Sequence, residues 1–168
     1  KVNKKKIIIG YISPDFRQHA VIYFSYTMLA NFNRNVFEVF CYAKGLADDI
    51  TFKLKAVVDK WQNVDNLEYE DIAKLIYADN IDILVDLAGH TAHSLLPVLA
   101  YKPAPLQISG IGYFNTTVLK TVDYFLTDIN CDPIGKNDEF FSEQLLSLEH
   151  SHFCYSPLID MGAVSTLP

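Results

Sequence analysis

The sequence predicts an α/β fold in which a mostly parallel, Rossmann-like sheet lies between two layers of helices. Short apolar runs rich in β-branched residues alternate with longer segments of helical periodicity along the chain. One run, residues 81–87, is apolar almost throughout, as is typical of a strand buried on both faces. Strands that alternate with helices favour right-handed crossovers, which make neighbouring strands parallel.

The first strand–loop–helix–strand unit begins at residue 6. Residues 6–12 (KIIIGYI) are mostly β-branched and apolar, which predicts a buried strand. Pro14 keeps Ser13 out of helical geometry, so a loop follows as far as His19. Apolar residues then cover most of the surface of a predicted helix over residues 19–31, and the second strand is predicted over residues 36–43.

The remaining elements continue the alternation. Pro97 makes one predicted helix short or kinked, unless the proline lies in its first turn. Asp65 or Asn66 is expected to cap the predicted helix at residues 68–79. In order, the predicted elements are a helix over about residues 48–60, an edge strand at 61–64, a helix at 68–79, strand 81–87, a helix at 93–101, strands 106–109 and 122–127, a polar loop at 128–140 and a last strand at 144–148.

Length and charge exclude several classes of protein. With 168 residues, the chain is long enough for one domain with a core of its own. Its 14 basic and 20 acidic residues give a net charge of −6, which argues against non-specific binding to nucleic acid or acidic membranes. No apolar run approaches the roughly 18 residues of a membrane span, and no signal-peptide pattern is visible. We therefore expect neither nucleic-acid nor membrane partners.

The cysteines and the common motifs narrow the function further. Three scattered cysteines, without a Cys-x-x-Cys pair, argue against a disulfide framework or zinc site and favour a reducing, cytoplasmic location. No G-x-G-x-x-G motif follows the first strand, which excludes dinucleotide binding on this chain. The absence of G-x-S-x-G likewise argues against a nucleophile elbow.

Three loops should meet at the carboxyl edge of the sheet, where open parallel sheets bind their ligands. They are residues 13–19, 89–91 and 110–117. Two histidines, one carboxylate and several hydroxyls would gather there, a set that suits general base chemistry on a hydroxyl acceptor. The residues concerned are Asp15, His19, His90, Thr91, Tyr113, Asn115, Thr116 and Thr117.

Several of these polar residues also have a purely structural interpretation. His19 could begin a helix and bond to a backbone carbonyl, and His90 could fix a turn. The spacing from His19 to His90 matches no local metal motif, so no metal is expected. Four other residues are expected to have structural or surface places: Asp86 accepting hydrogen bonds from loop amides, Cys41 in the core, and His150 and His152 on a surface or interface.

Six segments together resemble the catalytic region of O-linked N-acetylglucosamine transferases, including the SPINDLY-type members. The opening motif of that family, G-Y-x-S-x-D-F-x-x-H, is matched by residues 10–19 (GYISPDFRQH). Its D-L-x-G-H-T motif is matched at residues 86–91, and its R-P-A-P-x-Q motif resembles residues 102–107 (KPAPLQ). The other matching segments, in the same order, lie at residues 37–42, 111–117 and 122–128, so the resemblance covers about residues 6–157.

The resemblance implies a two-lobed glycosyltransferase of the GT-B type. Residues 1–157 would form its N-terminal, Rossmann-like lobe, and residues 158–168 a tail or the start of an interlobe linker. The family moves N-acetylglucosamine from UDP-GlcNAc to protein Ser/Thr hydroxyls, with inversion, without a metal and without a cofactor besides the nucleotide-sugar donor. The complete protein would also carry a C-terminal donor-binding lobe and N-terminal tetratricopeptide repeats. Without the second lobe, this chain is expected to be inactive.

By the same resemblance, His19 and His90 are the catalytic residues and lie in one cleft, with His19 as the expected general base. The loop from Gly112 to Thr117 should border the donor and acceptor site. With the neighbouring loops at the same edge, the expected substrate-binding residues are Asp15, Thr91, Gly112, Tyr113, Asn115, Thr116 and Thr117.

Three residues depart from the family pattern, and one of them, Glu149 in place of a usual proline, bears only on a local turn. Val118 stands where a glycine is usual, and Asn115 where a glycine is common. These departures motivate an alternative, in which the chain is a non-catalytic interaction module that kept the fold of the lobe. The sequence leaves the transferred sugar open, because relatives use N-acetylglucosamine or fucose.

Overall fold

Strands and helices alternate through the part of the chain that the computed structural model describes, residues 6–158 and 162. The strands are β1 (Ile7–Ser13), β2 (Phe37–Ala43), β3 (Lys60–Asn63), β4 (Ile83–Asp86), β5 (Leu106–Gly110), β6 (Tyr124–Asp128) and β7 (Gln144–Leu148). The helices are α1 (Ala20–Ala30), α2 (Asp49–Lys55), α3 (Tyr69–Ala78) and α4 (Leu96–Leu99), with a 3₁₀ turn, η1 (Asp138–Phe140). Among these described residues, no helix is long and apolar enough to cross a membrane.

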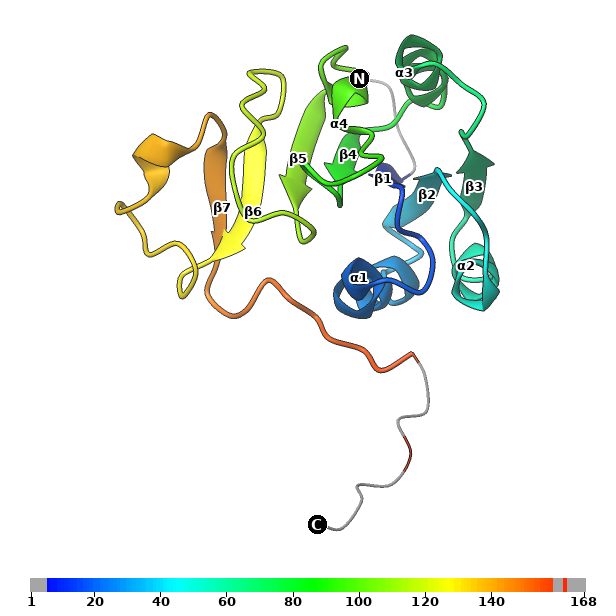
Figure 1. Cartoon of the computed structure of the whole chain (residues 1–168), viewed down its shortest axis with the longest axis horizontal. Coiled ribbons are helices and arrows are strands. Elements are labelled where there is room, and N and C mark those ends of the chain that lie inside the picture. Colours follow the sequence, from blue (N-terminus) through cyan, green and yellow to red (C-terminus); the bar gives the residue numbers. More distant parts are fainter. Residues whose placement is uncertain (1–5, 159–161, 163–168) are drawn as a thin grey trace.

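All neighbouring strands of the described sheet are parallel, in the order β3-β2-β1-β4-β5-β6-β7 (Figure 1). The chain winds outward from β1 to one edge and then crosses to β4, from which it winds to the other edge. This doubly wound order confirms the predicted Rossmann-like α/β fold. Its direction reverses between β1 and β4, so the loops that follow these two strands diverge at a switch point, where such sheets bind ligands.

Helices cover both faces of the sheet, with α1 and α2 on one side and α3 and α4 on the other (Figure 1). Leu84 of β4 packs with Ile72 of α3 in one hydrophobic cluster, and Cys41 of β2 lies with Leu29 of α1 in the other. Cys41 is fully buried, which confirms its predicted place in the core. Burial raises the pKa of its thiol far above the ordinary value, so the residue behaves as a small apolar side chain.

Three helices differ from the sequence-based expectations in length or capping. Helix α2 ends at Lys55, earlier than predicted, and α4 is a single turn with Pro97 in its first turn, where proline costs no hydrogen bond. The predicted cap of α3 is wrong: Glu68 is the N-cap and makes no side-chain capping bond. Asp65 instead accepts hydrogen bonds from the Gly45 backbone N–H (2.5 Å) and the Asn63 side chain (2.8 Å), so its carboxylate ties two loops together.

After β7 the chain runs back across α1 (Figure 1). Phe153 packs on Phe24 with 4.9 Å between ring centroids, and the backbone N–H of Ser156 donates to the Tyr23 carbonyl at 2.7 Å. His152, at the start of this segment, is 5% exposed. The expectation that His152 lies on a surface is therefore wrong, because its ring packs against Asp128 at the end of β6 and against Phe153, whereas His150 is exposed as expected.

Candidate active site at the carboxyl edge of the sheet

The three polar loops do lie at one edge of the sheet, because the strands that precede them, β1, β4 and β5, are parallel neighbours. Two adjoining pockets open there, one of about 580 Å³ lined by His90 and one of about 540 Å³ lined by His19. Thr91 and His93 line both pockets. The two histidines thus lie at the same edge of the sheet, and each lines a different one of these adjoining pockets.

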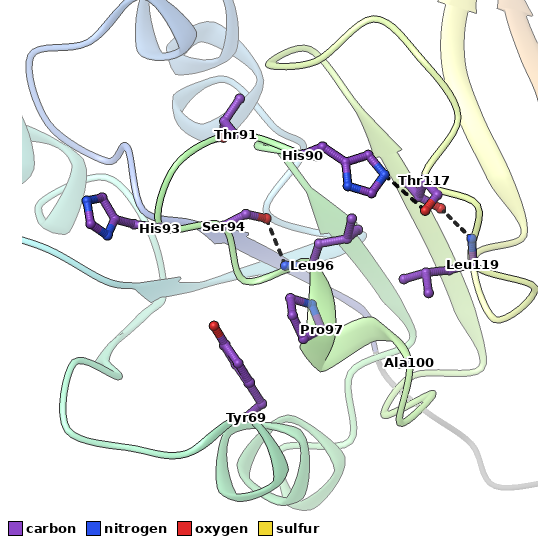
Figure 2. A pocket seen from close by; sticks show the side chains of 11 residues that line it. Tyr69, His90, Thr91, His93, Ser94, Leu96, Pro97, Ala100, Thr117 and Leu119 are labelled. Atoms are coloured by element: carbon purple, nitrogen blue, oxygen red, sulfur yellow. Dashed lines mark hydrogen bonds between the residues drawn. The ribbon is translucent and has the colours of Figure 1, made fainter.

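The larger pocket is formed by the loop after β4, helix α4 and the loop after β5 (Figure 2). Tyr69, at the start of α3, and Pro97 give it apolar walls, whereas His90 and Thr91 give it polar ones. Tyr69 and His93 were not predicted as site residues. No motif marks them, and only the packing of α3 against α4 brings Tyr69 to this edge.

A buried carboxylate builds the turn that presents His90. Asp86, fully buried at the end of β4, accepts hydrogen bonds from the backbone N–H groups of Gly89 (2.8 Å) and Ala88 (3.2 Å) and from the Ser109 hydroxyl (2.7 Å). This confirms the predicted structural role of Asp86. Burial raises the pKa of its carboxyl, and the three hydrogen bonds only partly offset that effect.

Two glycines let the loops approach one another. Gly89 has φ +56°, and a Cβ there would stand 2.6 Å from the Cβ of Tyr113. At Gly112, a Cβ would collide with the carbonyl oxygen of Leu87. The close approach places the Tyr113 ring edge-on to the His90 ring, with 5.5 Å between centroids.

The imidazole of His90 is held in one orientation by the loop after β5. Its Nε2 lies 3.1 Å from the carbonyl oxygen of Thr117, as Figure 2 shows. Because a carbonyl oxygen only accepts hydrogen bonds, Nε2 must carry the proton, and Nδ1 of the neutral ring keeps its lone pair. Nδ1 has no hydrogen-bond partner within residues 6–158.

His19 has a different arrangement, in which the ring caps helix α1. Its Nδ1 accepts a hydrogen bond from the Val21 backbone N–H at 3.4 Å and lies 3.7 Å from a carboxylate oxygen of Asp15. The structural alternative for His19 thus holds in part, although the partner is an amide and not a carbonyl. In the neutral ring, the proton then lies on Nε2, so the outer nitrogen donates and does not accept.

Asp15 is buried, and Arg17 contacts its other oxygen at 3.4 Å. Both residues line the smaller pocket with His19. This pocket also contains Lys44 and Asp65, so its charge is mixed. His19 Nε2–H can donate a hydrogen bond to an acceptor backbone or an anion. Its Nδ1 is occupied by the Val21 N–H and is not available as a base.

The hydroxyls predicted to bind substrate are largely committed to the protein itself. Thr91 donates to the Ala88 carbonyl at 3.0 Å, and Thr116 donates to Glu143 at 2.7 Å. Thr117 is buried, and both its backbone N–H and its hydroxyl donate to Glu143. Asn115 is exposed and accepts from the Thr116 N–H at 2.8 Å. Glu143 was missed by sequence reasoning, because it lies about 26 residues away and belongs to no recognised motif.

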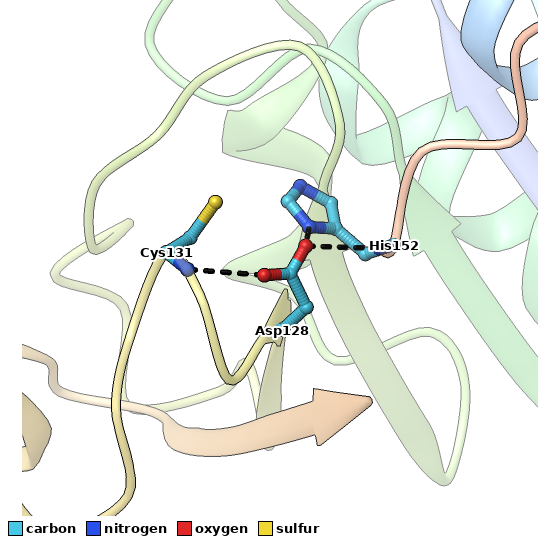
Figure 3. Close-up of side chains that lie close together, drawn as sticks. All are labelled: Asp128, Cys131 and His152. Carbon is cyan, nitrogen blue, oxygen red and sulfur yellow. Dashed lines mark hydrogen bonds and ion pairs between the residues drawn. The ribbon is translucent and has the colours of Figure 1, made fainter. Parts of the chain in front are cut away.

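A second polar cluster, away from the pockets, consists of Asp128, Cys131 and His152 (Figure 3). Their potential ligand atoms lie within 4.8 Å of one another, a spacing that could hold a metal ion. The His152 ring and backbone N–H both bond to Asp128 (2.7 and 3.1 Å), and the Cys131 N–H does so at 3.0 Å. These bonds hold the pKa of the Asp128 carboxyl well below its usual range, whereas burial and Asp128 raise the pKa of the Cys131 thiol. In the observed structure these hydrogen bonds tie the end of β6, at Asp128, to the start of the returning segment, at His152.

This architecture, a doubly wound parallel sheet with adjoining pockets at its switch point, defines a Rossmann-like α/β domain with a candidate ligand site. The chain belongs to glycosyl transferase family 41, whose family model matches residues 1–157.

Named relatives agree with this assignment. The chain is 38% identical over 173 residues to the probable UDP-N-acetylglucosamine–peptide N-acetylglucosaminyltransferase SPINDLY of Oryza sativa, and the match covers 100% of this chain and 19% of that protein. It is 32% identical to the corresponding SEC protein of Arabidopsis thaliana, with 89% of this chain and 15% of that protein covered. The chain thus spans under a fifth of the length of these relatives.

A solved structure shows the same fold. An O-GlcNAc transferase variant from Thermobaculum terrenum matches with a TM-score of 0.85 and 34% sequence identity, covering 89% of this chain and 29% of that one. The predicted resemblance to this family and the predicted lobe of a GT-B-type glycosyltransferase are both confirmed.

Proposed function

We propose that this chain is the N-terminal lobe of an inverting, metal-independent protein O-glycosyltransferase that moves N-acetylglucosamine from UDP-GlcNAc to Ser/Thr hydroxyls of proteins. The observation that carries the proposal is a pocket of about 580 Å³ in a family 41 chain, lined by a histidine whose Nδ1 is unprotonated in the neutral ring. Relatives named as peptide N-acetylglucosaminyltransferases support the substrate class.

In this proposal His90 is the general base. A Ser/Thr hydroxyl is a weak nucleophile near neutral pH, and removal of its proton during attack accelerates transfer by typically ~10²–10⁴-fold. Nδ1 of His90 accepts that proton, while the Thr117 carbonyl stabilises the resulting imidazolium through its bond to Nε2–H. Attack by the hydroxyl breaks the bond between the sugar and the diphosphate in one displacement, which inverts the anomeric centre.

His19 has a separate part. Because Nδ1 is engaged with the Val21 N–H, its Nε2–H is suited to donate a hydrogen bond to the acceptor backbone or to a donor oxygen. Asp15 and the nearby backbone hold the ring at that position. His19 therefore contributes to binding and positioning, whereas the proton of the acceptor goes to His90.

The remaining parts of the proposal concern the complete protein. A C-terminal lobe would bind most of the nucleotide-sugar donor, tetratricopeptide repeats would precede the chain, and the location would be cytoplasmic. No cofactor besides the donor would take part. The 168-residue chain alone would not turn over UDP-GlcNAc, because both lobes are needed to position donor and acceptor.

The test uses the longer protein that contains this chain, with UDP-GlcNAc and an acceptor peptide. We expect His90→Ala to lower kcat by on the order of 10²-fold or more with the donor KM little changed. His150→Ala, which changes an exposed histidine that lines neither pocket, is the control and should keep most of the activity. Near-normal turnover by a folded His90→Ala variant would sink the assignment of the base.

The wild-type protein also decides between the enzyme and an interaction module. Sugar transfer detected by mass spectrometry supports the enzyme, and replacing UDP-GlcNAc with GDP-fucose identifies the sugar. A folded, full-length wild-type protein that transfers neither sugar would favour the interaction module, for which the departures at Asn115 and Val118 are the reason to consider it.

A further inference from the structure

We propose that Glu143 is a positioning residue for the reaction: it holds Thr117 so that the Thr117 carbonyl fixes the orientation and tautomer of His90. The inference rests on the proposed role of His90 as general base. It concerns a residue outside the three predicted loops, in the segment that leads into β7.

The carboxylate of Glu143 is buried, with the residue 5% exposed, and is surrounded by donors from one loop. One oxygen accepts the Thr117 backbone N–H at 2.7 Å and also the Thr117 hydroxyl. The other oxygen accepts the Thr116 hydroxyl at 2.7 Å. Burial by itself raises the pKa of the Glu143 carboxyl, but these hydrogen bonds outweigh it, and the net pKa lies below the usual range. The group is therefore an anion at neutral pH.

The loop needs such an anchor because its backbone lies outside regular secondary structure. Residues 111–123, between β5 and β6, have no strand ladder or helix to set the direction of their peptide groups. Val118, directly after Thr117, has φ +61°, a left-handed conformation that is costly for a β-branched residue. The three bonds to Glu143 offset that cost. The Thr116 hydroxyl, which donates to Glu143, also accepts the Val118 N–H at 3.1 Å and so links Glu143 to the peptide unit between Thr117 and Val118.

The peptide unit between Thr117 and Val118 carries the carbonyl oxygen to which His90 Nε2–H donates. Thr117 donates to Glu143 through its N–H and accepts from His90 Nε2 through its carbonyl oxygen, at 3.1 Å. A shift of this carbonyl would remove the only acceptor that the described residues offer to Nε2–H. The proton could then move to Nδ1, and the ring would no longer be fixed with Nδ1 toward the pocket. A misplacement of about 1 Å can cost ~10²-fold in rate.

A positioning role predicts coupling to His90, whereas a role in folding alone does not. In the longer protein, Glu143→Ala should lower kcat by on the order of 10- to 100-fold with the donor KM little changed. In a His90→Ala background, Glu143→Ala should cause no further loss. Equal losses from Glu143→Ala in both backgrounds would overturn the inference, while an active His90→Ala variant would overturn the proposed function instead.

A second readout needs no activity and uses the 168-residue chain. With ¹⁵N-labelled histidine, the Nδ1 resonance of His90 in the wild type should lie at the position of an unprotonated nitrogen. In Glu143→Ala it should move toward the average of two tautomers. Glu139→Ala, which removes an exposed carboxylate from the nearby turn η1, is the matched control and should leave the resonance unchanged. An unchanged resonance in a folded Glu143→Ala chain contradicts the proposal.

Milder variants keep the test decisive if Glu143→Ala does not fold. Glu143→Gln retains the oxygen that faces Thr117, so it should keep the His90 resonance and most of the kcat. Thr117→Val removes the hydroxyl but keeps the backbone N–H, so it should have an intermediate effect on both. Losses by Glu143→Gln that exceed those of Thr117→Val would contradict the assigned contact.

Discussion

The Nε2 of His90 donates to the carbonyl oxygen of Thr117 over 3.1 Å, and this contact assigns different parts to the two ring nitrogens. The proton is placed on the nitrogen that faces the loop after β5, and the lone pair on the other. In His19 the other ring nitrogen, Nδ1, is the one in contact with the protein, and it accepts a hydrogen bond from the Val21 N–H. The two histidines at this edge are therefore not equivalent, and the following predictions test how the structure holds each of them.

The helix-capping and chemical roles of His19 can be separated by substitution. His19→Ala should lower the free energy of unfolding by about 1 kcal/mol, because the Val21 N–H loses its cap. His19→Asn should restore stability, since asparagine is a favoured N-cap, but it should not restore transfer activity if the ring Nε2–H binds substrate. Thermal melts of the chain and turnover by the longer protein measure the two effects. Full activity of His19→Asn would show that the cap is the entire role.

Gly89 should tolerate no side chain, for steric reasons in addition to its backbone conformation. Gly89→Ala combines a left-handed φ of +56° with a Cβ that would stand 2.6 Å from Tyr113. We expect a loss of about 2–4 kcal/mol, the sum of a conformational penalty and overpacking. Gly135→Ala is the matched control: its φ is +75° but its Cβ would meet nothing within 4 Å, so the loss should be about 1 kcal/mol. Equal destabilisation in urea titrations would contradict the packing argument.

Asp86 is expected to be required as an acceptor more than as a charge. Asp86→Ala leaves the Gly89 and Ala88 N–H groups and the Ser109 hydroxyl without their partner, and should cost about 3 kcal/mol. Asp86→Asn keeps an acceptor oxygen and removes the buried charge, so it should cost much less. Urea titrations of both variants at pH 7 make the comparison.

The raised pKa of Asp86 also predicts a pH dependence. A carboxyl whose pKa is raised on folding contributes stability below its unfolded pKa of about 3.9, and that contribution is lost as pH rises through the folded value. Relative to Asp86→Asn, the wild type should therefore become less stable as pH rises from 4 toward 7. A constant difference between the two proteins over this range would show that burial does not perturb the group.

Asp128 should have the opposite pH dependence. Backbone N–H groups of His152 and Cys131, and the His152 ring, hold the pKa of its carboxyl below the usual range despite its burial. The stability it contributes is present above the unfolded pKa of about 3.9 and is lost as pH falls through the folded value. Melting curves from pH 6 to pH 2 should thus decline more steeply for the wild type than for Asp128→Asn. Asp138→Asn, at an exposed acid in η1, is the control and should decline as the wild type does.

Much of the fold followed from local pattern. Buried strands such as Ile83–Asp86 are continuous apolar runs, and helix α1 is apolar over most of its surface, so both could be located from residue type alone. The cap of α3 was predicted wrongly, because Asp65 met donors from distant Gly45 and from Asn63 that no local rule includes. The burial of His152 was missed for the same reason, because its partner Asp128 lies 24 residues earlier in the chain.

The sequence by itself determined the alternation of strands and helices, the loops that carry His19 and His90, and the family, because these depend on residue type, spacing and ordered motifs. The tertiary structure decided which nitrogen of each histidine is occupied, because that depends on which backbone group lies within about 3 Å of the ring. It also decided that Glu143, 26 residues after Thr117, anchors the loop. A hydrogen bond is directional and short-ranged, so partners far apart in the chain are set only when the sheet brings their strands together.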